Sequence, residues 1–485
     1  MHLAPKWTFT THGDVSAIPA VANGAVYFPD WGGYLNKVDA STGKLVWQTK
    51  IDSYLTGLGI AGGVSRAAPA VVGNAVYLGD QNGGHLFAVN ATTGQLLWRT
   101  TVDTHPFSIL TAGPLVANGI VYQGVASLEE GAAANGSYPC CTFRGSVVAV
   151  RASTGQVLWQ TYMLPDNGGV PCTTQGDSTQ DPPIPISGCG YSGAAVWGTT
   201  PAYDQTSNTL YVATGNNYTV PDSVKTCEDD GGSPGQCLSP DDHVDSIVAM
   251  DASTGQIKWS TGTDKFDDWN VACIPGVGSP NSCPANPGPD YDFGSGPQLF
   301  TIKKPNGQSQ LVVGAGEKSG EYWAMDAATG QIIWSQAAGP GSSLGGIEWG
   351  PATDGKRIYV AEENFYGIPY KLPSGQQITE ASWAAIDPAT GTILWQTPDP
   401  SGGPTALGPV TVADGVLYAP SMSGKVYALD ASSGKILWSY TTPGAAIGGA
   451  AVVNGSVYWG NGYSHLGIPG WNASTTFYDF TINGN

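Results

Sequence analysis

The sequence predicts an all-β protein built as one eight-bladed β-propeller. Three observations predict it: the composition, a repeat ending in tryptophan, and a strand pair before each copy. Only 12% of the 485 residues are charged, whereas 68 are glycine and 35 are proline. This composition is typical of turn-rich β-structure rather than of long helices. Hydrophobic residues make up 41% of the chain and 16 residues are tryptophan, so a large core can form.

The repeat is represented by Val-Asp-Ala-Ser-Thr-Gly-Lys-Leu-Val-Trp at residues 38–47. An Asp or Asn side chain can open its turn by binding backbone N–H groups, and the glycine accepts a positive φ. A strand pair such as 70–79 precedes each copy, which gives four strands per unit, as in a propeller blade. Seven copies end at Trp47, Trp98, Trp159, Trp259, Trp334, Trp395 and Trp438.

An eighth blade is predicted from the two ends of the chain. Residues 450–463 repeat the first half of a blade, and the pattern then degenerates through 477–480. Residues 6–9 resemble the tryptophan-bearing outer strand alone, so this N-terminal strand would close the last blade and remove an exposed sheet edge. Seven blades with a tail is the alternative. We expect the repeated tryptophans to pack between neighbouring blades as structural elements.

One domain, 1–485, is therefore expected, with insertions at about 162–191, 220–243 and 264–296. The 38 acidic and 19 basic residues give a net charge of −19. Nucleic acid is a poor partner for such a chain, because phosphate binding needs a basic surface. No apolar run is long enough for a membrane span. The start of the chain has no apolar leader, and we expect it to be a mature N-terminus.

All eight cysteines fall between residues 140 and 283, mostly in the insertions. They are expected to form disulfides, which indicates an extracytoplasmic location, either periplasmic or secreted. Zinc is the less favoured alternative, because there is no Cys-x-x-Cys pair. Chain order suggests the pairs Cys140–Cys141, Cys172–Cys189, Cys227–Cys237 and Cys273–Cys283.

The Ala-x-Asp-x-x-Thr-Gly-x-x-x-Trp pattern resembles the tryptophan-docking repeat of the quinoprotein dehydrogenases, which hold pyrroloquinoline quinone (PQQ) at the centre of an eight-bladed propeller. Several strings outside the repeat look like the polyvinyl alcohol dehydrogenase branch, in which the electron acceptor is a cytochrome c. These strings lie at residues 127–130, 140–145, 192–197, 213–218, 269–273 and 288–294.

The resemblance implies a PQQ- and calcium-dependent dehydrogenase that oxidises secondary, including polymeric, alcohols to ketones. Because the chain has no Cys-x-x-Cys-His string, its electrons would leave to a separate acceptor such as a cytochrome c. The alternative is a non-catalytic propeller that serves as a scaffold for protein–protein interaction.

The resemblance also places the cofactor and metal ligands. Trp197 lies outside the repeat and matches the tryptophan that supports the PQQ plane. Asn216, in Thr-Gly-Asn-Asn, matches a calcium ligand, although an Asn after Gly is also common in turns. Glu129 and Glu130 stand where the family has its ligand glutamate. Adjacent side chains diverge on an extended chain, so only one is expected to coordinate, and Glu130 is preferred.

The general base is assigned to Asp290 in Asp-Tyr-Asp, with a further role as a metal ligand, and Asp292 is the alternative. The family has Trp before its catalytic Asp, whereas this chain has Pro289. A separate Trp269-Asn270 aligns with the same motif, and an Asn cannot act as a base. Lys318 matches the cation beside the quinone oxygens, which would stabilise developing negative charge.

Three further groups are assigned with less support from motifs. Arg66 and Arg144 are expected to bind PQQ carboxylates. Glu348 and Trp349 are expected to line the mouth of the site. Cys140 and Cys141 could form the adjacent-residue disulfide known beside PQQ in alcohol-oxidising relatives; pairing with other cysteines is the alternative.

Overall fold

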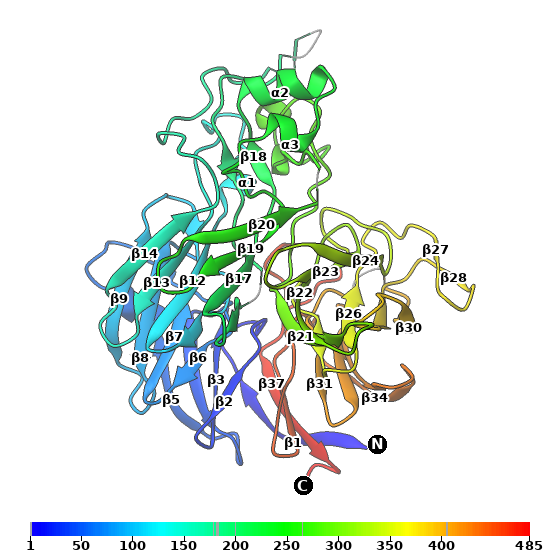
Figure 1. Ribbon diagram of the computed structural model, residues 1–485. Coiled ribbons are helices and arrows are strands. Elements are labelled where there is room, and N and C mark those ends of the chain that lie inside the picture. Colours follow the sequence, from blue (N-terminus) through cyan, green and yellow to red (C-terminus); the bar gives the residue numbers. More distant parts are fainter. Residues whose placement is uncertain (1, 178, 181–183, 199, 264, 404–405) are drawn as a thin grey trace.

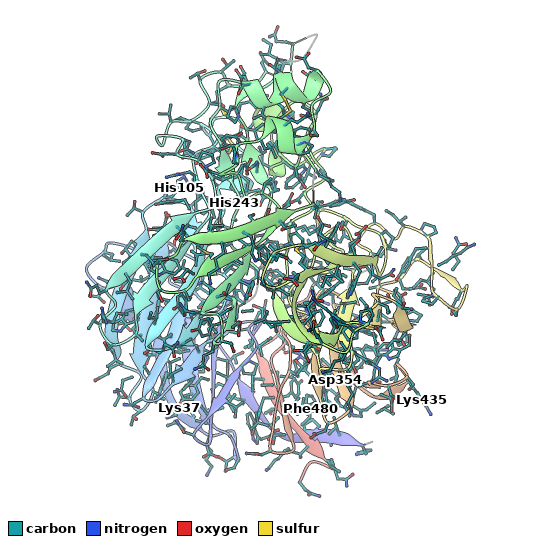
Figure 2. The ribbon with its side chains drawn as sticks, viewed as in Figure 1. Lys37, His105, His243, Asp354, Lys435 and Phe480 are labelled. Atoms are coloured by element: carbon teal, nitrogen blue, oxygen red, sulfur yellow. A yellow bond between two sulfur atoms is a disulfide. The ribbon has the colours of Figure 1, made fainter. Side chains whose placement is uncertain are left out.

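The computed structural model describes residues 2–177, 179–180, 184–198, 200–263, 265–403 and 406–485. Eight antiparallel sheets, each with at least four strands, surround a common axis (Figure 1). The predicted eight-bladed propeller is therefore confirmed. Side chains fill the spaces between neighbouring sheets (Figure 2).

Blades one to four follow one another in chain order, and in each of them the chain runs from the innermost strand outward. They are β2 (Ala20–Ala22), β3 (Ala25–Asp30), β4 (Tyr34–Asp39), β5 (Leu45–Lys50); β6 (Ala70–Val72), β7 (Ala75–Gly79), β8 (Gly84–Asn90), β9 (Leu96–Asp103); β11 (Leu115–Ala117), β12 (Ile120–Ser127), β13 (Ser146–Arg151), β14 (Val157–Tyr162); and β16 (Ala202–Asp204), β17 (Thr209–Ala213), β19 (Ser246–Asp251), β20 (Ile257–Gly262).

Blades five to eight repeat this order, and the last one is completed by the first strand of the chain. They are β21 (Gln298–Lys303), β22 (Ser309–Gly316), β23 (Glu321–Asp326), β24 (Ile332–Ala337); β25 (Ala352–Thr353), β26 (Ile358–Glu362), β29 (Ser382–Ile386), β30 (Ile393–Pro398); β31 (Thr411–Ala413), β32 (Val416–Pro420), β33 (Lys425–Asp430), β34 (Ile436–Thr441); and β35 (Ala451–Val453), β36 (Ser456–Trp459), β37 (Thr476–Ile482), β1 (Leu3–Thr10).

The remaining elements are short and lie in the connections. They are β10 (Ser108–Ile109), which pairs with β12; the pairs β15 (Ser192–Gly193) with β18 (Asn217–Thr219) and β27 (Tyr370–Lys371) with β28 (Gln377–Ile378); the helices α1 (Glu129–Ala132), α2 (Asp222–Asp229) and α3 (Pro234–Cys237); and the 3-10 turns η1 (Ile51–Leu55), η2 (Val271–Cys273) and η3 (Pro280–Ser282).

The ring is closed by its two ends. Strand β1 pairs antiparallel with β37, and Trp7 lies opposite Asp479. The N-terminal strand is thus the outer strand of the eighth blade, as predicted, and no blade is left half-formed. Both ends of the chain lie together at the bottom of Figure 1.

The repeated tryptophans join each blade to the next. The Trp259 indole N–H, for example, donates to the Ala327 carbonyl of the following blade at 3.2 Å. Its ring lies against Gly330, where an added Cβ would stand 2.6 Å from a ring carbon. That glycine also has a φ of +74°, so it serves both the turn and the packing. The same donation to a following blade is made by Trp7, Trp47, Trp98, Trp159, Trp334, Trp395 and Trp438.

The expected insertions gather on one side of the propeller. They lie between β14 and β15, between β18 and β19, and between β20 and β21; residues 178, 181–183 and 264 within them lie outside the described residues. Together with α2 and α3 they form the projection at the top of Figure 1. Contacts between separate segments tie it together: Cys172 N to Cys140 O, Gly188 N to the Asp222 carboxylate, Ser279 N to Ala134 O, and Lys225 to Asp268.

All eight cysteines are paired in disulfides, in the order expected along the chain: Cys140–Cys141, Cys172–Cys189, Cys227–Cys237 and Cys273–Cys283. Within the described part of the chain, no helix has both the length and the apolar character needed to cross a membrane.

Candidate active site

A cavity of about 390 Å³ lies where the inner ends of the blades converge. Its volume is within the range of pockets that hold small molecules and cofactors. Its wall is formed by strand ends and by the connections between blades. The residues predicted from the sequence that line it are Arg66, Glu130, Trp197, Asn216, Asp292, Lys318, Glu348 and Trp349.

A buried lysine joins two carboxylates at one wall. Lys318 Nζ lies 2.8 Å from Asp290 Oδ1 and 3.0 Å from Asp292 Oδ2. Burial alone would lower the pKa of Lys318, but the neighbouring carboxylates, led by Asp290 and Asp292, raise it well above its ordinary value. The ammonium group is therefore charged at neutral pH.

The two aspartates differ in their access to the cavity. Asp292 lines the cavity, whereas Asp290 stands behind the wall with 1% of its surface exposed. Burial raises the pKa of Asp290 well above its ordinary value, with Lys318 opposing the shift. The position of Asp290 in the Asp-Tyr-Asp motif favours this residue as the base, whereas Asp292 is the one that faces the cavity. The assignment of Asp290 therefore stays a prediction. Both carboxylates contact the same cation, so the loss of either one changes the surroundings of Lys318.

Aromatic rings and a guanidinium form the adjoining wall. The Trp197 indole N–H donates to Asp292 Oδ2 at 2.8 Å, and Lys318 Nζ lies 5.3 Å from the centre of the ring. Trp349 meets Trp197 edge-to-face at 5.2 Å. The Arg66 guanidinium lies 4.1 Å from the Trp349 ring and donates to the Tyr463 hydroxyl. A flat, anionic ring system fits this set, because it needs an aromatic face and a cation at its edge.

Two oxygen donors lie at the same cavity. The Asn216 amide nitrogen donates to the carbonyls of Asn217 and Trp269, which leaves the amide oxygen for the cavity. Glu130 is half-buried on α1, and burial raises its pKa to about 7. Across the described residues, no group of three His, Cys, Asp or Glu side chains is assembled as a metal site. An amide and a carboxylate oxygen are nevertheless the donor types that calcium prefers.

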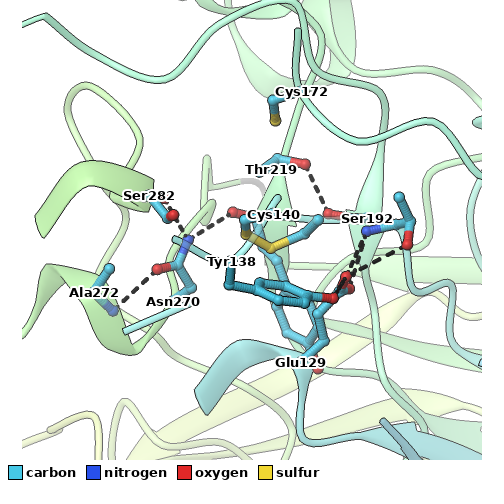
Figure 3. The surroundings of a disulfide bond; sticks show 12 residues. Glu129, Tyr138, Cys140, Cys172, Ser192, Thr219, Asn270, Ala272 and Ser282 are labelled. Atoms are coloured by element: carbon cyan, nitrogen blue, oxygen red, sulfur yellow. Dashed lines mark hydrogen bonds between the residues drawn. A yellow bond between two sulfur atoms is a disulfide. The ribbon is translucent and has the colours of Figure 1, made fainter. Parts of the chain in front are cut away.

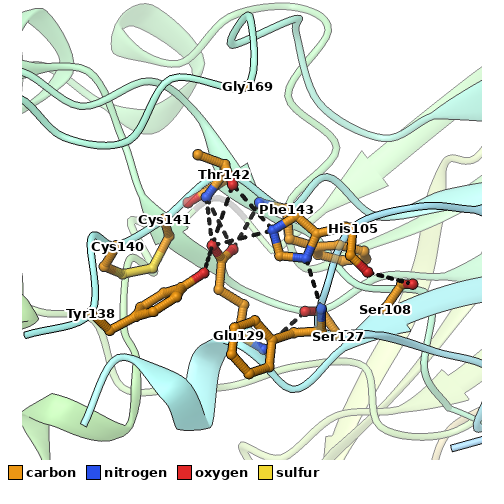
Figure 4. A network of polar contacts seen from close by, with 12 residues as sticks. His105, Ser108, Ser127, Glu129, Tyr138, Cys140, Cys141, Thr142, Phe143 and Gly169 are labelled. Carbon is orange, nitrogen blue, oxygen red and sulfur yellow. Dashed lines mark hydrogen bonds and ion pairs between the residues drawn. A yellow bond between two sulfur atoms is a disulfide. The ribbon is translucent and has the colours of Figure 1, made fainter. Parts of the chain in front are cut away.

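Glu129 is not available as a ligand, which corrects the sequence-based assignment. Its carboxylate accepts from the Tyr138 hydroxyl at 2.7 Å and from the backbone N–H groups of Thr142 and Phe143, and it lies 3.4 Å from His105 Nε2 (Figure 4). These bonds satisfy both oxygens and hold the loop that follows α1. The two glutamates diverge because they begin a helical turn, not because they lie on an extended chain.

Arg144 is also placed away from the cavity, contrary to expectation. Its guanidinium stacks on Tyr162 at 4.1 Å and pairs with Asp166 at 3.3 Å. Asn270 is a structural residue, because its side chain bonds Tyr218, Ser282 and Ala272 (Figure 3). Lys318 pairs with both carboxylates of Asp-Tyr-Asp, so this is the motif that reaches the lysine.

The Cys140–Cys141 disulfide does not line the cavity. Both cysteines are fully buried, between Tyr138 and the chain that carries Cys172 (Figure 3). They pack in the same apolar cluster as Ile109, Ala195 and Tyr218, whose other sides face the cavity. The disulfide therefore supports the wall from behind.

Several groups in or behind the wall were not anticipated. Asp267 accepts from the backbone N–H groups of Asp290 and Tyr291, which fixes the loop that presents both catalytic candidates. It lies two residues before the string at 269–273, but nothing in that string marked Asp267 itself as a functional residue. Trp31, Tyr463, His465 and Trp471 line the cavity mouth. For Trp31 and Trp471, the signal in the sequence was that they lie outside the tryptophan repeat, which left them without a structural explanation.

An eight-bladed propeller with an axial cavity that combines a buried lysine, two carboxylates and a tryptophan face defines the quinoprotein dehydrogenase class. The PQQ_2 family model, described as outer membrane protein assembly factor BamB, matches residues 4–127, 243–378 and 379–466. These matches cover most of the chain, and the chain belongs to this family.

Named relatives show to which branch of the superfamily the chain is similar. It is 28% identical to the polyvinylalcohol dehydrogenase of a Pseudomonas species, over 95% of this chain and 69% of that protein. The polyvinylalcohol dehydrogenase of a Sphingopyxis species is 27% identical, over 95% of this chain and 68% of its own length. The resemblance to the quinoprotein alcohol dehydrogenase superfamily, and to its polyvinyl alcohol dehydrogenase branch, is confirmed.

Solved structures support the same fold. Quinohemoprotein alcohol dehydrogenase from Comamonas testosteroni superposes with a TM-score of 0.71 at 20% identity, covering 100% of this chain and 77% of that one. BamB from Moraxella catarrhalis superposes with a TM-score of 0.55 at 14% identity, covering 99% of this chain and 100% of that one. The propeller alone therefore does not determine activity, which must be argued from the cavity.

Proposed function

We propose that this chain is a PQQ- and calcium-dependent dehydrogenase that oxidises secondary alcohols, polymeric ones included, to ketones and passes the electrons to a separate acceptor, a cytochrome c. The observation that carries the proposal is the buried Lys318, held between Asp290 and Asp292 beside the Trp197 ring in the axial cavity. The two related polyvinylalcohol dehydrogenases support the same reaction class.

The cavity residues divide into those that hold the cofactor and those that act on the alcohol. When bound, PQQ supplies a quinone that accepts hydride, and calcium polarises its carbonyl group. The Trp197 ring would support the plane and Arg66 would pair with a carboxylate. Asn216 and Glu130 would offer oxygen ligands to the metal.

The chain itself handles the proton. An alcohol hydroxyl in the cavity would give its proton to a carboxylate oxygen of the Asp290–Asp292 pair. Lys318 keeps its charge because the carboxylates around it raise its pKa, so it would stabilise negative charge that develops beside it. Trp197 would orient Asp292 through its 2.8 Å hydrogen bond.

The same proposal includes an extracytoplasmic location and an external acceptor. Four disulfides support a periplasmic or secreted protein, because such bonds persist in oxidising compartments. A net charge of −19 suits a basic electron acceptor. The acceptor is tested by measuring alcohol oxidation without dye, in the presence and in the absence of a purified basic cytochrome c. We expect turnover only when the cytochrome c is present.

The experiment is reconstitution with PQQ and calcium, followed by dye-linked oxidation of 2-butanol. We expect a quinone absorbance band that remains with the protein through gel filtration, together with dye reduction. Asp290→Asn and Asp292→Asn should keep the band, and the variant that removes the base should lose activity by about 10²-fold or more. A protein that retains no PQQ at micromolar concentration, with or without calcium, contradicts the proposal and favours the scaffold.

A further inference from the structure

A second hollow on the surface borders the axial cavity. This side groove, of about 660 Å³, lies between the first and eighth blades, and its walls include His12, Trp31, Ser464, His465, Ala473 and Thr475. Trp31 and His465 line the axial cavity as well. This pair of rings is therefore a wall that the two hollows share.

The walls of the side groove are held in place by the protein. The Trp31 indole N–H donates to Ser16 Oγ at 2.9 Å, and the His465 ring stacks on Trp31 at 4.0 Å. Buried Asp14 accepts from the Ser464 backbone and hydroxyl and from the Ser474 backbone. A groove ordered in advance loses less entropy when a ligand binds.

The chemistry of the side groove is neutral. Its described lining includes no Lys, Arg or Glu, and its one carboxylate, Asp14, is already hydrogen-bonded. Burial and the nearby Arg66 lower the pKa of His465, so its ring is uncharged at neutral pH. Aromatic faces can cover apolar carbon, and the Thr475 hydroxyl can bond an alcohol group. The Ser464 hydroxyl gives its proton to Asp14 and can still accept from an alcohol.

We propose that the side groove is an extended substrate subsite, which binds the flanking segment of a neutral polyhydroxylated chain while one carbinol group of that chain enters the axial cavity. This inference rests on the proposed function. The bound chain would run from the reacting centre past Trp31 and His465 to the seam between the first and last blades.

The first test is binding to the cofactor-free protein, which does not depend on turnover. Ala473 is an exposed groove residue, and Ala473→Arg should fill the groove. Ala389→Arg makes the same change at an exposed turn of the sixth blade. By calorimetric titration with a short, fully hydrolysed polyvinyl alcohol, A473R should bind at least tenfold more weakly than wild type, and A389R should match wild type. Equal binding by A473R and wild type would overturn the inference.

The second test uses the enzyme loaded with PQQ and calcium. The ratio of kcat/KM for the polymer to kcat/KM for 2-butanol should fall at least tenfold in A473R and stay constant in A389R. An unchanged ratio in A473R overturns the subsite. So does a specific loss of cytochrome c reduction with the ratio unchanged, because the groove would then serve the acceptor. If no variant oxidises either alcohol, the proposed function fails, and the binding test still decides the groove.

Discussion

The propeller body and the projection are stabilised in different ways. In the body, each blade is bound to the next by a tryptophan that donates to a carbonyl, and seven of these eight tryptophans also pack on a glycine. In the projection, the long insertions carry no such repeat and are joined by disulfides and by scattered polar contacts such as Lys225–Asp268. A repeating sequence can reuse one solution at every interface, whereas irregular insertions need covalent links.

The catalytic candidates stand where the two regions meet. Asp290 and Asp292 end the third insertion, and Lys318 follows β22 of the fifth blade. The body supplies rigid positions for Lys318 and Trp197. The projection supplies the loop that Asp267 anchors. Both regions therefore contribute to the geometry of the site.

The largest effect on stability is expected from a repeat glycine. Gly330→Ala adds a Cβ in contact with Trp259 at a φ of +74°. We expect a loss of about 3 kcal/mol, from the left-handed backbone and the overpacking together. Gly307 lies in the same blade at a φ of +81° with open space around its Cβ, so Gly307→Ala should cost only about 1 kcal/mol. Chemical unfolding followed by circular dichroism measures both, and equal losses would refute the packing role.

A smaller effect, of opposite sign, is expected in the closing blade. Asp479 has a buried, unpaired Oδ1, and burial raises its pKa to about 6. Because the folded state holds this proton more tightly, Asp479 destabilises the protein increasingly as pH rises from about 4 to about 6. Asp479→Asn should therefore raise stability above pH 6 by up to about 2 kcal/mol, with no gain below pH 4.

Asp430 provides the control for this prediction. Hydrogen bonds from Ser432 and Ser433 lower its pKa, so its contribution to stability is present at neutral pH and is lost as pH falls through the acid range. Asp430→Asn should thus destabilise the protein at neutral pH. Thermal melts between pH 4 and 8 measure the change in melting temperature of each variant relative to wild type. At neutral pH this change should be positive for Asp479→Asn and negative for Asp430→Asn. A change of the same sign in both variants would contradict the role given to Asp479.

The smallest effect on the body is expected from a disulfide of the projection. Cys227→Ser with Cys237→Ser removes the bond that joins α2 to α3. Limited proteolysis should become faster within residues 220–243, while the melting temperature followed by tryptophan fluorescence should stay within about 2 °C of wild type. A large drop in that temperature would show that the two regions unfold as one unit.

Much of the site was predictable because its residues stand in short, local motifs. Trp197, Asn216 and Lys318 each follow a recognisable string, and all three line the cavity. The roles predicted for Glu129 and Arg144 were wrong for a different reason. Their residue types fitted the expected chemistry, but Tyr138 and backbone N–H groups engage one, and Tyr162 and Asp166 engage the other. Partners brought from other segments cannot be read from a local string.

By itself, the sequence determined the repeat and its tryptophan joints, and it favoured eight blades, a closing N-terminal strand and the disulfide order, because each depends on spacing along the chain or on one repeated contact. The tertiary structure decided which of two adjacent glutamates faces the cavity, that Asn270 is structural, and that both Asp290 and Asp292 reach Lys318. It also brought Trp31 to His465 across almost the whole length of the chain. Those outcomes depend on which distant groups compete for each polar atom, and only the closed ring places these groups together.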